Sequence, residues 1–316
     1  MSKIVVTELM WPRGLEELRS CGSVVYDPEM WTKPEELVAE VTSADALIVR
    51  NATRVDASLL EAGRKLRVVG RLGVGLDNID LAAARRRRLP VVYARNANAT
   101  SVAEYVMAAL LEGSRKLYEA SASVRRGDWN RKQFTGAELY GKTLGLIGLG
   151  ETARRVAKRA RAFEMGVLGY DPYVAPYDYP VMEGGIEMVE LADLLRRADF
   201  VSLHVPLTSE TRHMISRDSF KMMRHDAWII NASRGGVLDE MALAAALNEG
   251  LIAGAVLDVL EEEPPPPDNP LLKQDRVILT PHVAGLTEES QERISLLIAR
   301  EVIRVLKGGH SLCLAT

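Results

Sequence analysis

Three ionisable side chains follow predicted strands in the C-terminal half of the chain, and their types suit acid–base chemistry on a carbonyl group. Arg234, Glu263 and His282 each come shortly after a short apolar segment rich in β-branched residues. Because the carboxyl ends of parallel strands meet at one edge of a sheet, we expect the three side chains to converge there. Taken singly, each is explained as well by a solvated charge or a structural histidine. Their shared placement favours a catalytic site.

These side chains supply what hydride transfer to a 2-oxo acid requires. A guanidinium such as Arg234 holds a carboxylate and polarises the adjacent ketone. A protonated imidazole, here His282, gives its proton to the developing alkoxide, and the neutral ring acts as base in the reverse reaction. A carboxylate on the other ring nitrogen, here Glu263, favours the imidazolium and fixes its orientation. We find no cluster with the spacing of metal ligands and expect no metal.

Residues 141–171 indicate where the hydride donor binds. An apolar strand is predicted up to Gly148, Gly150 and Ala153 follow at the spacing of a G-x-G-x-x-G/A turn, and an amphipathic helix comes next. The glycines allow a sharp turn and close approach of a pyrophosphate, whose charge faces the helix N–H groups. Asp171, at the end of the following strand, is placed to bind the adenine ribose and would repel the 2′-phosphate of NADP, so NAD is favoured.

Composition narrows the class of protein. The chain has 316 residues, 47% of them hydrophobic, which suits two domains. With 40 Lys and Arg against 43 Asp and Glu, there is no basic excess for nucleic acid or an anionic membrane. Cys21 and Cys313 fit free thiols in a reducing compartment. The N-terminal residues lack the apolar core of a signal peptide and no apolar run reaches transmembrane length, so we expect a cytoplasmic protein.

The order of predicted elements indicates an α/β protein with two doubly wound parallel sheets. Strands alternate with helices over residues 1–98, which predicts a small parallel sheet. Residues 99–284 predict a larger one of six or seven strands around the dinucleotide turn. A helix over 290–306 would return to the first domain. The helix that starts near Ser101 carries an apolar stripe that suits either a core or a second subunit; the stripe consists of Val106, Ala109, Leu110 and Leu117.

Two loops at strand ends of the first domain carry candidate anion ligands. Arg50 and Asn51, with Thr53 close by, place a cation and polar side chains after one strand. Gly73 and Val74 form a loop after another strand, whose N–H groups suit a carboxylate. The alternatives are a solvated arginine and simple turn geometry.

At this point the chain resembles the D-isomer-specific 2-hydroxyacid dehydrogenases, especially their phosphoglycerate-dehydrogenase-like branch, with some likeness to sulfolactate dehydrogenases. The resemblance covers essentially the whole chain. The motifs that carry it are VRNAT (49–53), GRLGVGLDNID (70–80), NATSVAE (98–104), GLIGLGETA (145–153), LHVPLT (203–208), NASRGGVLDE (231–240), LDVLEEEP (257–264) and LTPHVAG (279–285).

The resemblance implies specific roles for residues of this sequence. Arg234, His282 and the glutamate directly before proline, Glu263, match the family's catalytic residues. The implied NAD contacts are Gly148, Gly150, Glu151, Thr152, Asp171, His204, Pro206, Thr211, Ala232, Ser233, Arg234, Asp258, His282 and Gly285. The implied substrate contacts are Arg50, Asn51, Gly73, Val74, Arg234 and His282.

The resemblance also implies an architecture and a range of activities. A Rossmann NAD domain (99–284) would be inserted in a smaller, flavodoxin-like substrate domain (1–98 and 285–316), and two copies would form a homodimer. The substrate stays open among phosphoglycerate, sulfolactate and glycerate or hydroxypyruvate, with NAD as cofactor. The sequence up to Thr316 holds no appended regulatory domain, so serine-type feedback is not expected. Alternatives are an NAD-sensing, corepressor-like binding protein and a formate or phosphonate dehydrogenase; formate enzymes of this fold carry Gln at the position of Glu263.

Overall fold

The computed structural model describes residues 1–315 and divides into two compact units. The first comprises Met1–Asn98 and the segment that begins at Leu286, and the second comprises Ala99–Gly285. Thr316, the last residue of the expected substrate domain, lies outside the described residues. Within residues 1–315, no helix is both long and apolar enough to cross a lipid bilayer.

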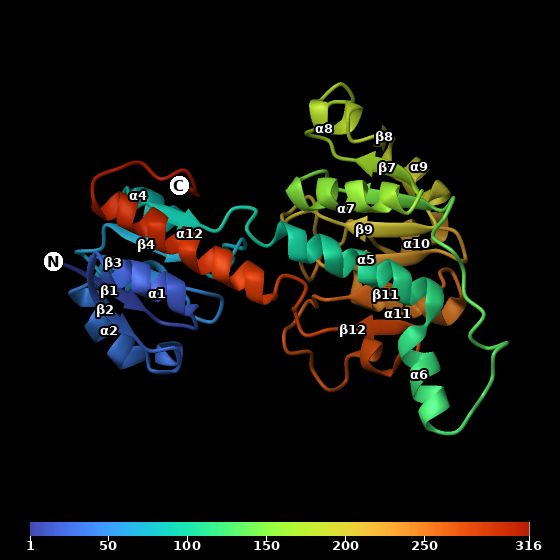
Figure 1. Ribbon diagram of the computed structural model, residues 1–316, viewed down its shortest axis with the longest axis horizontal. Helices are drawn as coiled ribbons and strands as arrows, with labels where there is room; N and C mark the ends of the chain where they lie inside the picture. Colours follow the sequence, from blue (N-terminus) through green and yellow to red (C-terminus); the bar gives the residue numbers. More distant parts are fainter. Residues whose placement is uncertain (316) are drawn as a thin grey trace. The chain divides into compact units, whose positions relative to one another are not determined.

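The first unit is a five-stranded parallel sheet with helices on both faces (Figure 1). Its strand order, β2-β1-β3-β4-β5, is the flavodoxin-like order. Helices α2, α3 and α4 pack on one face, and α1 and α12 on the other. The strands are β1 (Ser2–Val6), β2 (Gly22–Tyr26), β3 (Ala46–Val49), β4 (Val68–Arg71) and β5 (Val91–Tyr93); the helices are α1 (Pro12–Arg19), α2 (Pro34–Thr42), α3 (Ala57–Ala62), α4 (Leu81–Arg86), α12 (Glu288–Leu306) and a 3₁₀ turn, η1 (Met30–Thr32).

The second unit is a seven-stranded parallel sheet of order β12-β11-β10-β9-β6-β7-β8. Helices α5 and α7 cover one face, while α9, α10 and α11 cover the other. The strands are β6 (Thr143–Ile147), β7 (Gly166–Tyr170), β8 (Glu187–Met188), β9 (Phe200–Leu203), β10 (Trp228–Asn231), β11 (Gly254–Leu257) and β12 (Val277–Leu279). The helices are α5 (Ala99–Arg115), α6 (Leu117–Arg125), α7 (Glu151–Ala162), α8 (Tyr179–Met182), α9 (Leu191–Arg197), α10 (Arg217–Met222), α11 (Glu240–Glu249) and a 3₁₀ turn, η2 (Pro270–Lys273).

Strand order places the ligand-binding edge of the second sheet. The chain runs outward from β6 to β8, then restarts at β9 on the other side of β6, so the order reverses between β6 and β9. Ligands of such sheets bind outside the carboxyl ends of the strands at this switch point. Strands buried on both faces explain the continuous apolar runs seen in the sequence. Both predicted doubly wound parallel sheets are confirmed.

The apolar stripe of the helix predicted from Ser101 belongs to the core. Val106, Ala109 and Leu110 of α5 are buried in the core of the second unit. Leu117 does not continue the stripe, because Lys116 adopts a left-handed conformation (φ 51°) and ends the helix there. Leu117 instead begins α6 and is 60% exposed. Sequence periodicity alone did not reveal this break.

The close contact between Gly254 and Trp228 provides a test of packing in the second sheet. The two residues are register partners in β11 and β10, and a Cβ on Gly254 would lie 2.6–2.7 Å from carbons of the indole ring. We expect Gly254→Ala to lower the free energy of unfolding by about 1–3 kcal/mol in urea denaturation, because the ring or strand must move. Gly166→Ala is the control, since its Cβ would meet its nearest neighbour at 3.7 Å. Equal effects of the two substitutions would contradict this packing.

Candidate active site

The turn after β6 has the geometry of a dinucleotide site. Gly148 has a left-handed φ of 87°, and a Cβ there would lie 2.7 Å from the carbonyl oxygen of His204, so both conformation and space require glycine. Gly150 precedes α7, and a Cβ on it would meet no atom within 4 Å. That open approach to the backbone, together with the N–H groups at the start of α7, fits a pyrophosphate. Ala153 is fully buried where helix and sheet pack closely.

Asp171 lies at the end of β7 beside this turn. One carboxylate oxygen accepts a hydrogen bond from the N–H of Leu149 (2.8 Å), and the other accepts one from the N–H of Tyr173 (2.9 Å). These bonds hold the carboxylate against the turn, and each oxygen keeps capacity for a second donor such as a ribose hydroxyl. The position therefore fits the role in NAD binding predicted for Asp171.

The side chain of Glu151, the first residue of α7, is paired with an arginine one helical turn later. Its Oε1 atom accepts hydrogen bonds from Arg155 Nη2 (2.6 Å) and Nε (3.0 Å). Arg155 also donates to the hydroxyl of Thr100 (2.5 Å). The arginine thus offsets a negative charge that would otherwise oppose a phosphate at the helix start, where Thr152 follows. Arg155 was not among the predicted site residues, although its i,i+4 spacing from Glu151 is a recognisable signal.

The loop after β9 contains three further residues that the family resemblance assigned to NAD. The Nε2 atom of His204 lies 2.9 Å from the hydroxyl of Ser202. Burial lowers the pKa of His204 to about 4, so the ring is neutral at physiological pH. Thr211 donates its hydroxyl proton to the carbonyl oxygen of Pro206 (2.6 Å) and accepts the N–H of Thr208 (2.7 Å), which fixes the shape of the loop.

Asp258, after β11, anchors the loop that carries His282. The residue is 2% exposed, and its carboxylate accepts hydrogen bonds from the hydroxyl of Thr280 (2.6 Å) and the N–H groups of Val283 and Ala284 (both 2.8 Å). Its carbonyl oxygen accepts the N–H of His282 (2.9 Å). His282 has a left-handed φ of 54°, which is uncommon for a residue other than glycine. The four hydrogen bonds that this loop donates to Asp258 hold it in that conformation.

Tyr105 of α5 extends this network. Its hydroxyl lies 2.6 Å from the hydroxyl of Thr280, which itself donates to Asp258. Burial, opposed by the bond to Thr280 and aided by the charge of Asp258, raises the pKa of Tyr105 to about 12. The phenol therefore keeps its proton throughout the physiological range. Sequence analysis missed both Tyr105 and Thr280.

Glu263 and His282 form the hydrogen-bonded pair expected of an acid–base site. Glu263 Oε2 lies 2.8 Å from His282 Nδ1, and the other oxygen accepts the N–H of Leu260 (3.1 Å). Burial alone would raise the pKa of Glu263, but the bond to His282, with the charges of His282 and Arg234, outweighs it and the pKa is lowered. The group is thus a carboxylate at neutral pH. Because Nδ1 is engaged, Nε2 is the ring atom left for proton transfer.

Arg234 lies in a loop after β10 that is held by several hydrogen bonds. The side chain of Asn231 donates to the carbonyl oxygen of Arg234 (2.9 Å) and accepts both the N–H and the hydroxyl of Ser233 (3.0 and 2.7 Å). A Cβ on the next residue, Gly235, would lie 1.8 Å from the carbonyl oxygen of Leu260. Only glycine permits this contact, which brings the loops of Arg234 and Glu263 together. Ala232 precedes Ser233 in the same loop, and Gly285 follows the loop of His282.

Glu240, which sequence analysis did not single out, supports the loop of Glu263. The residue is 8% exposed, and its carboxylate accepts hydrogen bonds from the N–H of Glu261 (2.5 Å) and the side-chain amide of Asn269 (2.8 Å). Glu261 itself pairs with His213 Nε2 at 3.0 Å. Of the consecutive acids in this loop, Glu263 is the one that contacts His282.

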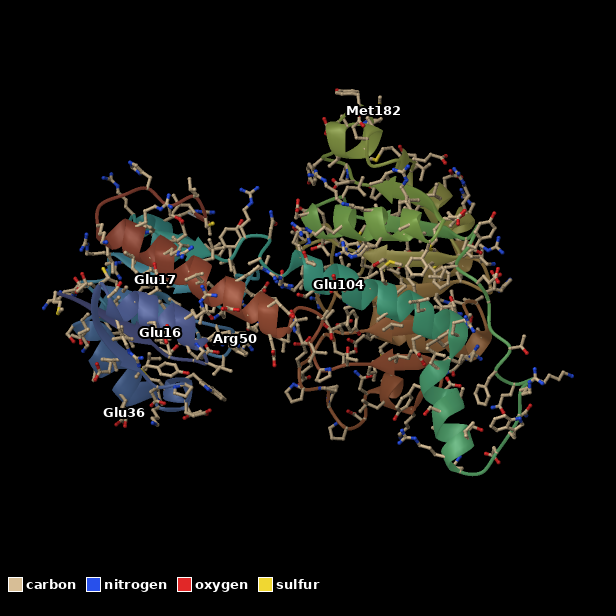
Figure 2. All side chains as sticks on the ribbon, viewed as in Figure 1. Glu16, Glu17, Glu36, Arg50, Glu104 and Met182 are labelled. Carbon is tan, nitrogen blue, oxygen red and sulfur yellow. The ribbon has the colours of Figure 1, made fainter. Side chains whose placement is uncertain are left out.

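The candidate substrate residues of the first unit are arranged differently from expectation. Arg50 and Asn51 follow β3, and Figure 2 labels Arg50. Thr53, expected beside them as a polar group for substrate, is 2% exposed and bonds to the hydroxyl of Thr7 (2.7 Å), so that expectation is wrong. The N–H of Gly73, next to Val74, donates to the carbonyl oxygen of Arg71 (2.8 Å). One of the two N–H groups expected to hold an anion is therefore engaged within its own loop.

Comparison with known proteins agrees with this geometry. The family profile "D-isomer specific 2-hydroxyacid dehydrogenase, NAD binding domain" matches residues 107–284. The chain is 47% identical to D-3-phosphoglycerate dehydrogenase of Methanocaldococcus jannaschii, covering 98% of this chain but 58% of that protein. It is 42% identical to (S)-sulfolactate dehydrogenase of Chromohalobacter salexigens, covering 97% of this chain and 99% of that one. The crystal structure of the TT0316 protein from Thermus thermophilus has a TM-score of 0.89 and 32% identity, covering 99% of this chain and 100% of its own.

The two curated relatives differ in length relative to this chain. The chain spans little more than half of the phosphoglycerate dehydrogenase and nearly all of the sulfolactate dehydrogenase. Within the part of the chain that the structure describes, no group of three or more His, Cys, Asp and Glu side chains is arranged to hold a metal ion.

The position of Asp171 yields a test of cofactor choice. We expect Asp171→Asn to weaken NADH binding about tenfold and to narrow the preference over NADPH, because the carboxylate that accepts ribose hydroxyls and repels the 2′-phosphate is lost. Titration of NADH and NADPH fluorescence measures both. Asp193→Asn, at a partly exposed position in α9 of the same unit where the carboxylate pairs with Arg197, is the control. Unchanged affinity for both nucleotides in the Asp171 variant would contradict the assigned role.

Proposed function

The chain belongs to the D-isomer-specific 2-hydroxyacid dehydrogenase family, and we propose that it interconverts a 2-oxo acid and its 2-hydroxy acid with NAD as cofactor. The observation that carries the proposal is the Glu263–His282 pair, with Nδ1 of the imidazole bonded to the carboxylate at 2.8 Å. It lies at the carboxyl edge of the sheet that contains the dinucleotide turn. This arrangement supplies an oriented acid–base group at the edge where the nucleotide binds.

Each member of the site has a separate task in the proposed reaction. Arg234 binds the substrate carboxylate and polarises the ketone. His282, as the imidazolium, gives its Nε2 proton to the ketone oxygen, and Glu263 stabilises that charge. In the reverse direction neutral His282 accepts the hydroxyl proton. The turn at Gly148 and Gly150 would hold NADH, which would supply the hydride when bound.

Loss of the acid–base group should abolish most of the activity. We expect His282→Ala to lower kcat by about 10²–10⁴-fold while NADH affinity is retained, as measured by steady-state kinetics and nucleotide fluorescence. Glu263→Gln should also lower kcat, whereas Glu262→Gln, at an exposed neighbouring position, is the control. A His282 variant within a few-fold of the wild type would show the mechanism to be wrong. Tight NADH binding with no turnover of any 2-oxo acid would favour a binding protein.

We propose that the substrate carries a second anionic or polar group, as in phosphoglycerate, sulfolactate or glycerate. Support comes from the cationic side chain of Arg50 at a strand end and from the similarity to dehydrogenases named for phosphoglycerate and sulfolactate. Arg50 would bind the distal group, with Asn51 beside it.

A panel of 2-oxo acids tests this substrate class. We expect 3-phosphohydroxypyruvate or 3-sulfopyruvate to be preferred over glyoxylate in NADH consumption assays. Arg50→Ala should lower kcat/KM for these distal anions about 10–100-fold and spare glyoxylate, because a charge-assisted bond to the distal group is lost. Equal losses of kcat/KM on all substrates would instead show that Arg50 does not recognise the distal group.

We further propose that two copies form a homodimer in the cytoplasm. Large apolar side chains are exposed in α6 and the segment after it, which Figure 1 shows projecting from the second sheet. Burial of these side chains against a second copy would lower the free energy relative to their exposure to water. The two cysteines, Cys21 and Cys313, are free thiols and fit a reducing compartment. The exposed side chains are Leu117, Tyr118, Val124, Trp129 and Tyr140.

A further inference from the structure

The loop of residues 50–53 is wrapped around the carboxylate of Glu8. Glu8 Oε1 accepts the N–H groups of Arg50 (2.8 Å) and Thr53 (2.9 Å), and Oε2 accepts those of Asn51 (3.1 Å) and Ala52 (2.9 Å). Glu8 is 5% exposed and lies just past the end of β1, whose neighbour β3 leads into the loop. Four consecutive amides therefore converge on a single internal anion.

Converging amides of this kind form an anion-binding nest, and here the anion belongs to the chain itself. A buried charge is tolerated only when hydrogen bonds replace its lost hydration. Burial raises the pKa of Glu8, but the bonds from Ala52, Thr53 and Arg50 outweigh it and the pKa is lowered. The carboxylate therefore stays ionised at neutral pH, and the bonds to it are charge-assisted.

Asn78 binds the carbonyl groups of the same loop. Its side-chain amide donates to the carbonyl oxygens of Arg50 (3.1 Å) and Thr53 (2.7 Å). The hydroxyls of Thr53 and Thr7 pair at 2.7 Å beneath the loop. Side chains from two distant segments thus satisfy both the donors and the acceptors of the loop backbone. Few other conformations of the loop would keep all these bonds.

We propose that Glu8 and Asn78 are positioning residues for substrate recognition. Glu8 fills the anion site made by the loop amides, so a distal anion on the substrate is bound by the side chains of Arg50 and Asn51 rather than by backbone. We call the hydrogen bonds of the 50–53 backbone to Glu8 and Asn78 the clamp. The clamp holds the backbone of Arg50 in one conformation and so lowers the entropy lost when substrate binds. This inference rests on the function proposed for Arg50.

Hydrogen exchange tests the clamp without any substrate. Glu8→Gln replaces one acceptor oxygen by an NH₂ group that faces N–H donors, and we expect the amides of residues 50–53 to exchange at least about tenfold faster. Glu301→Gln is the matched control, because Glu301 is also buried in the first unit (3% exposed) and accepts the N–H of Leu312 (2.8 Å) far along the chain from the loop. Asn78→Ala leaves Glu8 intact and should also speed exchange of the amides of residues 50–53. This variant tests the clamp if the Glu8 variant does not fold. Exchange no faster than in the Glu301 variant overturns the clamp.

Kinetics test whether the clamp serves recognition. We expect Glu8→Gln to raise KM for 3-phosphohydroxypyruvate about tenfold with little change for glyoxylate, and Glu8→Asp, which keeps the charge, to restore part of the loss. The Glu301 variant should show neither effect. Faster loop exchange with equal changes in KM for both substrates would overturn the positioning role. Absence of turnover in the wild-type protein would refute the proposed function, while the exchange rates would still decide whether the clamp exists.

Discussion

The hydrogen bonds to the buried Asp258 are the interactions on which the arrangement of the candidate catalytic edge depends. Its carboxylate receives one hydroxyl and two N–H groups from the loop after β12, and its backbone carbonyl receives a third N–H from the same loop. The left-handed conformation of His282 costs roughly 1–2 kcal/mol for a residue with a Cβ, and these bonds offset it. His282 can then meet Glu263 at 2.8 Å through Nδ1, which leaves Nε2 for the proposed proton transfer.

In both units, buried carboxylates hold the loops that carry the candidate functional residues. A loop at the carboxyl end of a parallel strand has backbone N–H groups without a ladder partner, and a buried carboxylate accepts them. Asp258 does this beneath the loop of His282, Glu240 beneath the loop of Glu263, and Glu8 beneath the loop of Arg50. Charge-assisted bonds to backbone are stronger than neutral ones, so loops that carry reactive side chains are held rigidly on the sheet. The residues proposed for chemistry depend on acids that do not react.

The sequence predicted the architecture and a shared sheet edge for the candidate reactive groups, but not the residues that support them. Buried parallel strands, the spacing of Gly148 and Gly150, and the parallel-strand rule led to both sheets and to one edge for the candidate residues. The role of Glu8 was not predicted because its partners lie 42–45 positions away and are backbone amides, which no local sequence pattern indicates. The buried hydroxyl of Thr53 was misjudged because spacing does not tell which way a side chain turns. The break before Leu117 was misjudged because spacing does not show that the backbone of Lys116 is left-handed.

Isotope transfer tests hydride transfer in this protein most directly. The protein is incubated with 3-phosphohydroxypyruvate or glyoxylate and NADH deuterated at C4 on one face or the other, and the product is examined by mass spectrometry and NMR. Hydride transfer predicts deuterium at C2 of the 2-hydroxy acid from one face only, with the hydroxyl proton drawn from solvent. Product without deuterium from either labelled face, or C2 labelled from D₂O, would contradict the proposed reaction.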